Sequence, residues 1–109
     1  TNAVLPLMRA RKSGRIVTLS SSGGVSSVPF AGYYCATKHA LEAYTEALRL
    51  ELEPFGIQAV TVAPGPVSTT AGDTAIRPDR PLPEYADRRQ KADAKYVAGI
   101  RGGMDPARV

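Results

Sequence analysis

The sequence predicts an α/β fold, in which one helix connects two parallel strands of a larger sheet. Two short apolar runs rich in β-branched residues, 15–21 and 57–63, have the composition of strands buried on both faces. Between them, apolar residues recur at helical spacing from about residue 33 to residue 55. A strand, a helix and a second strand make one βαβ unit with a right-handed crossover. Because such a unit alone leaves a face and an edge uncovered, we expect this chain to be a fragment of a doubly wound parallel sheet.

The segments on either side of the first strand are a helix end and a loop. Val4, Leu5 and Met8 lie at helical spacing, and the pattern stops before Gly14, so residues 2–12 are predicted to be the end of a helix. The segment 21–32 is rich in serine and glycine, and it is predicted to be a loop.

The long helix carries two different stripes. The apolar stripe consists of Leu41, Tyr44, Leu48, Leu52 and Phe55, and a stripe of small side chains consists of Ala36, Ala40, Ala43 and Ala47. The small stripe would allow close approach of either a sheet or another helix. Pro54 lies in the last turn and Gly56 follows it, so the helix is predicted to end there.

After Thr70 the composition changes. Three prolines stand within residues 78–83, and a helix is predicted from about Pro83, with a thin apolar stripe of Tyr85, Ala92, Tyr96 and Ile100. This pattern is typical of a segment that lies outside the core and covers a ligand-binding site. Asp105 and Pro106 are predicted to be the N-cap and first residue of a further helix.

Composition excludes several classes of protein. The chain has 109 residues, of which 43% are hydrophobic and 22% are charged, as in ordinary globular domains. No apolar run approaches the roughly 20 residues of a membrane-spanning helix, and no secretory leader is recognisable. The single cysteine, Cys35, cannot form an internal disulfide, and no residues have the spacing of a metal site. We therefore expect no metal, no membrane partner and a reducing cytoplasm.

The net charge of +4 raises the question of nucleic-acid binding. Basic residues cluster at Arg9, Arg11, Lys12 and Arg15, and again at Arg88, Arg89, Lys91 and Lys95. Neither cluster has much aromatic interleaving or lies in a known nucleic-acid-binding motif. We interpret both clusters as solvated surface and expect no nucleic-acid partner.

The stretch GYYCATKHA, residues 32–40, places a tyrosine beside a lysine. Residues i and i+4 share one face of a helix, so Tyr34 is paired with Lys38, whereas Tyr33 is paired with Thr37. A free phenol has a pKa near 10, which is too high for proton transfer at neutral pH. An ammonium about 4–5 Å away stabilises a phenolate by roughly 3–4 kcal/mol. Such a pair is suited to general acid/base catalysis between an alcohol and a carbonyl.

The context strengthens this interpretation. The pair alone is a weak signal, because a lysine packed along a half-buried tyrosine is common. However, Ser20, Ser21 and Ser22 follow the first strand, and the sequence PGPVST follows the second. Because parallel strands end at one edge of a sheet, these segments and the start of the helix are expected to meet at the edge where such sheets bind ligands.

The segment from Gly14 to Thr69 resembles the middle of the short-chain dehydrogenases/reductases. The resemblance rests on the strand that ends in serines, on YCATK and on PGPVST, and it extends over about residues 1–70. It implies that the fold is Rossmann-like and that the catalytic residues are Ser21, Tyr34 and Lys38. Ser21 would hydrogen-bond the substrate oxygen, Tyr34 would be the acid/base, and Lys38 would tune Tyr34.

The resemblance also implies a cofactor, NAD or NADP. Tyr34 and Lys38 match residues at the nicotinamide ribose, and Pro64, Gly65, Val67 and Thr69 match the turn that holds the nicotinamide carboxamide. The backbone of Val67 and the hydroxyl of Thr69 are the expected contacts. The family's glycine-rich phosphate loop, its catalytic asparagine and the residue that selects NAD or NADP have no match here, and we expect them upstream of Thr1.

The resemblance further implies how the chain is organised. We expect one partial domain, residues 1–109, with a catalytic core in 1–70, a substrate lid in 71–103 and the start of a truncated helix in 104–109. We expect a complete enzyme to interconvert a secondary alcohol and a ketone as a homodimer or homotetramer, which related enzymes often form through the long helix. The chain alone is expected to be inactive.

Two other functions stay open. One is a non-catalytic Rossmann-like binding or regulatory protein, since fold alone does not give function. The other is a nucleotide-sugar epimerase or dehydratase of the family's extended branch, which uses the same tyrosine and lysine.

Two residues next to Tyr34 and Lys38 are interpreted as structural. His39 is expected to be a surface residue with no acidic partner, and Cys35 a small buried filler.

Overall fold

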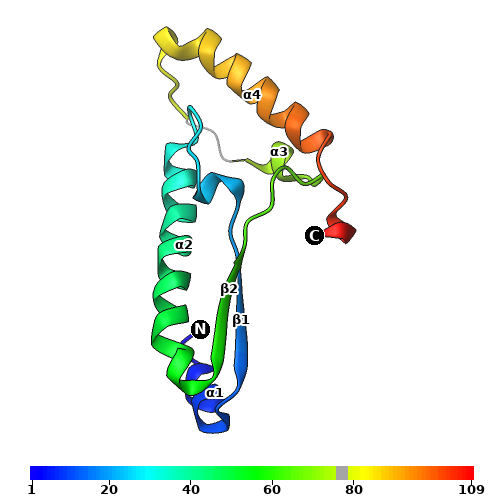
Figure 1. Cartoon of the computed structure of the whole chain (residues 1–109). Helices are drawn as coiled ribbons and strands as arrows, with labels where there is room; N and C mark the ends of the chain where they lie inside the picture. Colours follow the sequence, from blue (N-terminus) through cyan, green and yellow to red (C-terminus); the bar gives the residue numbers. More distant parts are fainter. Residues whose placement is uncertain (76–78) are drawn as a thin grey trace. The chain divides into compact units, whose positions relative to one another are not determined.

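The predicted strand–helix–strand unit is present in the first half of the chain (Figure 1). The computed structural model describes residues 1–75 and 79–109 and forms two compact units, Thr1–Ala63 and Pro64–Val109, called here the N-terminal and C-terminal units. The N-terminal unit contains α1 (Leu5–Arg11), β1 (Gly14–Leu19), α2 (Gly32–Leu52) and β2 (Ile57–Val62). Short 3₁₀ helices, η1 (Ser22–Gly24) and η2 (Glu53–Phe55), precede and follow α2.

The two strands are parallel neighbours. Their register runs from Gly14 opposite Ile57 to Leu19 opposite Val62, so the two carboxyl ends are level. This confirms the predicted α/β class and parallel pairing, with strand boundaries that differ by one or two residues from the prediction. The level ends place Ser20, the residue after β1, beside the last residue of β2, and Ser20 N donates to the Val62 carbonyl oxygen at 2.8 Å.

The core of the N-terminal unit lies between α2 and one face of the sheet. Its buried members are Leu48, Leu52, Ile57 and Ala59, and Leu5, Met8, Ile16 and Phe55 pack against them. A partly buried hydrogen bond of 2.9 Å, from Thr45 Oγ1 to Thr18 Oγ1, joins the helix to β1. The predicted apolar stripe is therefore only partly correct, because Tyr44 is exposed and Thr45 takes the buried place. Burying Thr45 is tolerable because its hydroxyl has a partner.

The expectation that both strands are buried on both faces is wrong for this chain. Burial alternates along β1, with Val17 58% and Leu19 60% exposed, and their partners Val60 and Val62 are exposed as well. Side chains of a strand alternate between two faces, and α2 covers one of them. The other face presents a patch of four aliphatic side chains to solvent, as expected for a βαβ unit taken alone.

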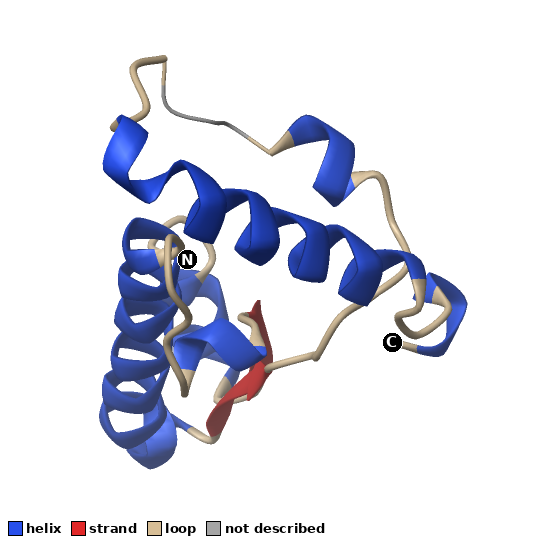
Figure 2. Ribbon diagram, turned by 90° about the horizontal axis from the view of Figure 1, so that it is seen from above, coloured by secondary structure: helices blue, strands red, loops and turns tan. Residues whose placement is uncertain are grey.

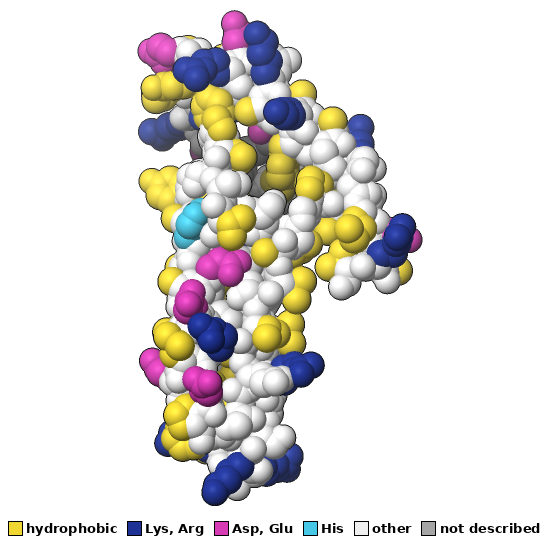
Figure 3. Space-filling model, in the orientation of Figure 1, with side chains coloured by type: hydrophobic (Ala, Val, Ile, Leu, Met, Phe, Trp, Pro, Cys, Tyr) yellow, Lys and Arg dark blue, Asp and Glu magenta, His cyan; other side chains and the backbone are white. Residues whose placement is uncertain are grey.

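The end of the N-terminal unit opposite the carboxyl ends of the strands contains a turn at Gly56 and a basic surface. Gly56 has a positive φ of 66°, and a Cβ there would lie 2.7 Å from the Lys12 carbonyl oxygen, so this turn requires glycine. The basic residues 9–15 are exposed at this end, where Figure 3 shows Lys and Arg side chains. Arg9 also stacks over the Phe55 ring at 4.3 Å from its centroid.

The C-terminal unit is mainly helical. It contains α3 (Ala71–Thr74), η3 (Pro83–Tyr85), α4 (Ala86–Arg101) and η4 (Pro106–Arg108), and Figure 2 shows α4 as its long helix. The predicted start near Pro83 is confirmed, and so is the Asp105 cap, which accepts a hydrogen bond of 2.9 Å from Ala107 N. The short α3 was not predicted, since four residues show no period. Residues 76–78 of the predicted lid lie outside the described residues.

In the described ranges, no helix is long and apolar enough to cross a bilayer.

The two compact units meet in the sequence after Ala63. The division predicted at residue 70 separates functional roles, a catalytic core from a substrate lid, and it stays a prediction.

Candidate active site

Three consecutive serines follow β1, and they differ in surroundings. Ser20 is buried, and its Oγ lies 3.5 Å from the Lys38 carbonyl oxygen of α2, which is a long contact. Ser21 has extended backbone and caps η1, where its Oγ accepts a hydrogen bond of 3.1 Å from Gly23 N. Ser22 is exposed. Within the described residues no group accepts the Ser21 hydroxyl proton, so this hydroxyl can still donate to a ligand.

Two glycines allow this loop to pack closely on α2. A Cβ at Gly24 would lie 2.6 Å from Ser20 Oγ and 3.1 Å from the Lys38 carbonyl oxygen. A Cβ at Gly23 would lie 3.0 Å from Tyr34 Cε1 and 3.6 Å from Ser21 Oγ. The Ser21 hydroxyl and the edge of the Tyr34 ring therefore both lie within 3.6 Å of the position that a Gly23 Cβ would take.

The two tyrosines at the start of α2 are in different environments. Tyr33 is 95% exposed, whereas Tyr34 is 48% exposed and has one ring edge against Gly23. Thr37 Oγ1 donates to the Tyr34 carbonyl oxygen at 2.7 Å, so Thr37 is engaged with the helix backbone. Of the two phenols, Tyr34 is the one on the side of the serine loop.

Lys38 lies beside Tyr34, as the i,i+4 rule predicts. Its Nζ is 5.8 Å from the centroid of the Tyr34 ring and donates a hydrogen bond of 3.2 Å to the carbonyl oxygen of Leu19, the last residue of β1. The N-terminal unit therefore brings Ser21, Tyr34 and Lys38 together at the carboxyl end of β1. A hydroxyl donor, a phenol and an ammonium at one place can hold an oxygen and exchange a proton with it.

The predicted cofactor turn lies in the C-terminal unit, so it is described separately. Met104 N donates to the Pro66 carbonyl oxygen at 2.9 Å, and Ser68 N donates to the Met104 carbonyl oxygen at 2.8 Å, which makes Val67 and Met104 a parallel bridge. Thr69 Oγ1 accepts a hydrogen bond of 3.3 Å from Ala71 N at the start of α3. A Cβ at Gly65 would meet nothing within 4 Å, so there is open space beside this part of the turn.

The neighbours of the pair have local roles. His39 Nδ1 lies 2.9 Å from the Cys35 carbonyl oxygen, one helical turn earlier, which agrees with a surface residue bonded to its own helix. Cys35 is 1% exposed and packs inside the unit, as a small filler does. No group of three or more His, Cys, Asp or Glu side chains in the described part of the chain has the arrangement of a metal site.

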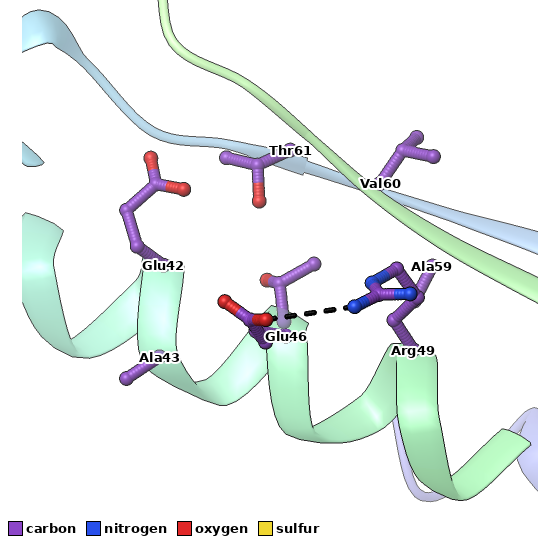
Figure 4. A pocket seen from close by; sticks show the side chains of 8 residues that line it. Glu42, Ala43, Glu46, Arg49, Ala59, Val60 and Thr61 are labelled. Atoms are coloured by element: carbon purple, nitrogen blue, oxygen red, sulfur yellow. Dashed lines mark hydrogen bonds and ion pairs between the residues drawn. The ribbon is translucent and has the colours of Figure 1, made fainter. Parts of the chain in front are cut away.

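A separate pocket lies between α2 and β2 (Figure 4). It has a volume of about 360 Å³, and its lining residues are Glu42, Ala43, Thr45, Glu46, Arg49, Ala59, Val60 and Thr61. Arg49 pairs with Glu46 at 3.5 Å, and Glu42 Oε1 is buried with no hydrogen-bond partner among the described residues. None of the predicted site residues lines it.

Sequence reasoning missed Gly23, Gly24, Gly103 and Met104 as residues that shape these places. The Gly-Gly pair directly after the serines was the available signal, because consecutive glycines often permit close backbone contact. Met104 gave no signal, since it acts through its main chain.

Known proteins match this chain closely. A family model described as short chain dehydrogenase matches residues 1–80. The probable short-chain type dehydrogenase/reductase VdlC of Helicobacter pylori is 48% identical over 96 residues, which are 88% of this chain and 35% of that protein.

Solved structures of short-chain dehydrogenases also resemble this chain. A short-chain dehydrogenase from Streptomyces avermitilis has a TM-score of 0.77 and 36% identity, covering 98% of this chain and 39% of that one. A short chain dehydrogenase/reductase from Burkholderia phymatum, solved in complex with NAD, has a TM-score of 0.74 and 27% identity, covering 94% of this chain and 38% of that one. The chain therefore spans 35–39% of the length of these three relatives.

Proposed function

Because this chain belongs to the short-chain dehydrogenase/reductase family, we propose that it carries the catalytic residues of an NAD(P)-dependent oxidoreductase that interconverts a secondary alcohol and a ketone. The observation that carries the proposal is that Ser21 Oγ and the edge of the Tyr34 ring both lie within 3.6 Å of the position a Gly23 Cβ would take, while Lys38 Nζ lies 5.8 Å from the centroid of the same ring. A substrate oxygen bound beside this loop could reach one hydroxyl donor and one phenol.

The proposed roles follow from the hydrogen-bonding capacity of each group. Ser21 Oγ already accepts from Gly23 N, so its hydroxyl donates to the substrate oxygen and holds it in place. In oxidation, the Tyr34 phenolate takes the proton of the substrate hydroxyl as the carbonyl forms. In reduction, the Tyr34 hydroxyl gives that proton to the developing alkoxide. Lys38 stabilises the phenolate through its charge and is oriented by the Leu19 carbonyl oxygen.

Family members use NAD or NADP, which supplies the acceptor or donor of the hydride. The residues present suit such a cofactor. The main-chain N–H and C=O groups of Val67 make no hydrogen bond to any described group, and there is open space beside Gly65. Pro64, Gly65, Val67 and Thr69 would hold the nicotinamide carboxamide, and Tyr34 and Lys38 would bind the ribose hydroxyls.

The finer aspects of the assignment are part of the same proposal. The substrate is a small alcohol or carbonyl compound, and the predicted lid segment, residues 71–103, would determine which compound is accepted. The complete enzyme is a cytoplasmic homodimer or homotetramer. Exposure of Ala36, Ala40, Ala43 and Ala47 on α2 supports a helix–helix subunit contact over packing on the sheet.

The experiment that tests the function compares two adjacent phenols in the full-length protein. NAD(P)H formation or consumption is followed with a panel of secondary alcohols and ketones, and cofactor binding is measured by calorimetry. Tyr34→Phe should abolish turnover, while cofactor affinity stays within a few-fold. Tyr33→Phe, the matched control, should leave turnover largely intact. An equal loss of turnover in both variants would contradict the proposed role of Tyr34 as the acid/base.

A further inference from the structure

The Pro66–Ser68 turn is fastened by a segment that returns to it from the far end of α4. Met104 N donates to the Pro66 carbonyl oxygen at 2.9 Å, and Ser68 N donates to the Met104 carbonyl oxygen at 2.8 Å. Both bonds use main-chain atoms only, and all these residues lie in the C-terminal unit. The predicted lid therefore leaves this turn through Thr69 and comes back to it at Met104.

A parallel bridge of this kind determines which main-chain groups of Val67 stay available. Met104 binds the residues before and after Val67, so the N–H and C=O groups of Val67 itself point to the opposite edge. No described group pairs with them. A strand edge with one free N–H and one free C=O can take a ligand that offers a carbonyl and an N–H side by side, as a primary carboxamide does.

Gly103 permits the close approach that the bridge needs. A Cβ at this position would lie 2.5 Å from the Pro66 carbonyl oxygen, 2.6 Å from the Pro66 carbonyl carbon and 2.9 Å from Val67 N. All three are backbone atoms, so no side chain can rotate away to make room. Any residue other than glycine must displace the turn. The adjacent Gly102 differs, because a Cβ there would come no closer than 3.4 Å to the Ala98 carbonyl oxygen.

The rest of the unit supports the returning segment. A Cβ at Gly72 of α3 would be 3.7 Å from both Ile100 Cδ1 and Val97 Cγ2, so α3 packs on the last turns of α4. Ile100 is buried there. Gly103 N donates to the Ile100 carbonyl oxygen at 3.0 Å, which continues this packed end of the helix into the bridge.

We propose that Gly103 and Met104 are positioning residues that hold the Val67 main chain in the orientation that recognises the cofactor's carboxamide. This inference rests on the proposed function and concerns two residues outside the predicted site. Gly103 acts by having no side chain, and Met104 acts through its N–H and C=O groups. Neither needs to touch the cofactor.

The test separates recognition of the carboxamide from recognition of the rest of the cofactor. In the full-length protein, calorimetry measures the affinity of the preferred dinucleotide, NADH or NADPH, and of the matching ADP-ribose or 2′-phospho-ADP-ribose, which lacks the nicotinamide. Gly103→Ala should weaken dinucleotide binding roughly tenfold or more and leave binding of the ADP-ribose compound unchanged. Gly102→Ala should change neither. A loss of equal size for both ligands, or no loss, would overturn the proposal.

A second pair of variants covers the case in which Gly103→Ala does not fold. Met104→Pro removes the N–H donor to Pro66 without adding a Cβ beside the turn, whereas Met104→Ala keeps both main-chain bonds. Selective loss of dinucleotide affinity in the proline variant alone supports the inference, and equal behaviour of the two variants contradicts it. If the wild-type protein binds neither dinucleotide, the proposed function fails and the inference fails with it. If the wild type binds and these variants bind equally well, only the inference fails.

Discussion

Lys38 donates a hydrogen bond from Nζ to the Leu19 carbonyl oxygen at 3.2 Å, and this bond connects an early turn of α2 to the last residue of β1. The ammonium is therefore held at the end of the strand and beside the Tyr34 ring at the same time. A lysine that only covered apolar surface would have no such fixed partner. The geometry links the orientation of Lys38, the proposed catalytic lysine, to the strand that Ser21 follows.

Removing the ammonium should affect activity far more than stability. Lys38→Met in the full-length protein should lower kcat by about 100-fold or more, because the phenolate loses its neighbouring charge. The free energy of unfolding should change by less than about 1 kcal/mol, since the hydrogen bond to the Leu19 carbonyl oxygen is exposed. Steady-state kinetics and urea unfolding measure the two effects. A large loss of stability would instead assign Lys38 a structural role.

The neighbouring serines offer a matched pair of variants. Ser21→Ala should reduce kcat/KM by about 100-fold, because it removes the hydroxyl that is proposed to donate to the substrate oxygen. Ser20→Ala should change kcat/KM by only a few-fold, since Ser20 Oγ makes one long contact within the unit. Kinetics with a fixed substrate compare them. The reverse order of the two losses would show that the assignment is shifted by one residue.

Gly24 should tolerate no side chain. Gly24→Ala should lower the free energy of unfolding by about 1–3 kcal/mol, because its Cβ would meet Ser20 Oγ and the Lys38 carbonyl oxygen. Gly32→Ala is the control, since a Cβ there meets nothing within 4 Å and alanine favours a helix. Urea unfolding of the full-length protein distinguishes them. Similar midpoints for both variants would argue against close packing of the loop on α2.

The buried threonine pair should behave as a coupled unit. Thr45 is 2% exposed, and its hydroxyl donates to Thr18 Oγ1. Thr45→Val should cost about 1–3 kcal/mol of stability, because it leaves the partly buried Thr18 hydroxyl without its partner. Replacing both threonines by valine should cost less than the sum of the single changes. A double-mutant cycle by urea unfolding measures this coupling, and strict additivity would exclude it. Cofactor affinity should not change.

Local sequence patterns predicted the elements and the proximity of Tyr34 and Lys38, but not the contacts between residues far apart in the sequence. The spacing of Tyr34 and Lys38 follows from helix geometry alone, so their proximity could be predicted. The exchange of Tyr44 for Thr45 in the core could not, because it depends on the partner hydroxyl of Thr18 on another element. Likewise, the requirement for glycine at position 103 depends on the Pro66 backbone, far away in the sequence. Burial on both strand faces was overpredicted because it depends on layers that α2 alone does not supply.

The open sheet face bears on how this stretch of polypeptide behaves during synthesis. As the two strands emerge from a ribosome, solvent would surround the side chains of Val17, Leu19, Val60 and Val62. The outer edges of the strand pair would also present backbone N–H and C=O groups that have no hydrogen-bond partner. Neighbouring nascent chains can pair through such edges faster than a slow long-range fold is completed. When residues 1–109 are expressed alone, the polypeptide should therefore aggregate. Co-expression of chaperones that bind apolar surface should increase the yield of soluble protein.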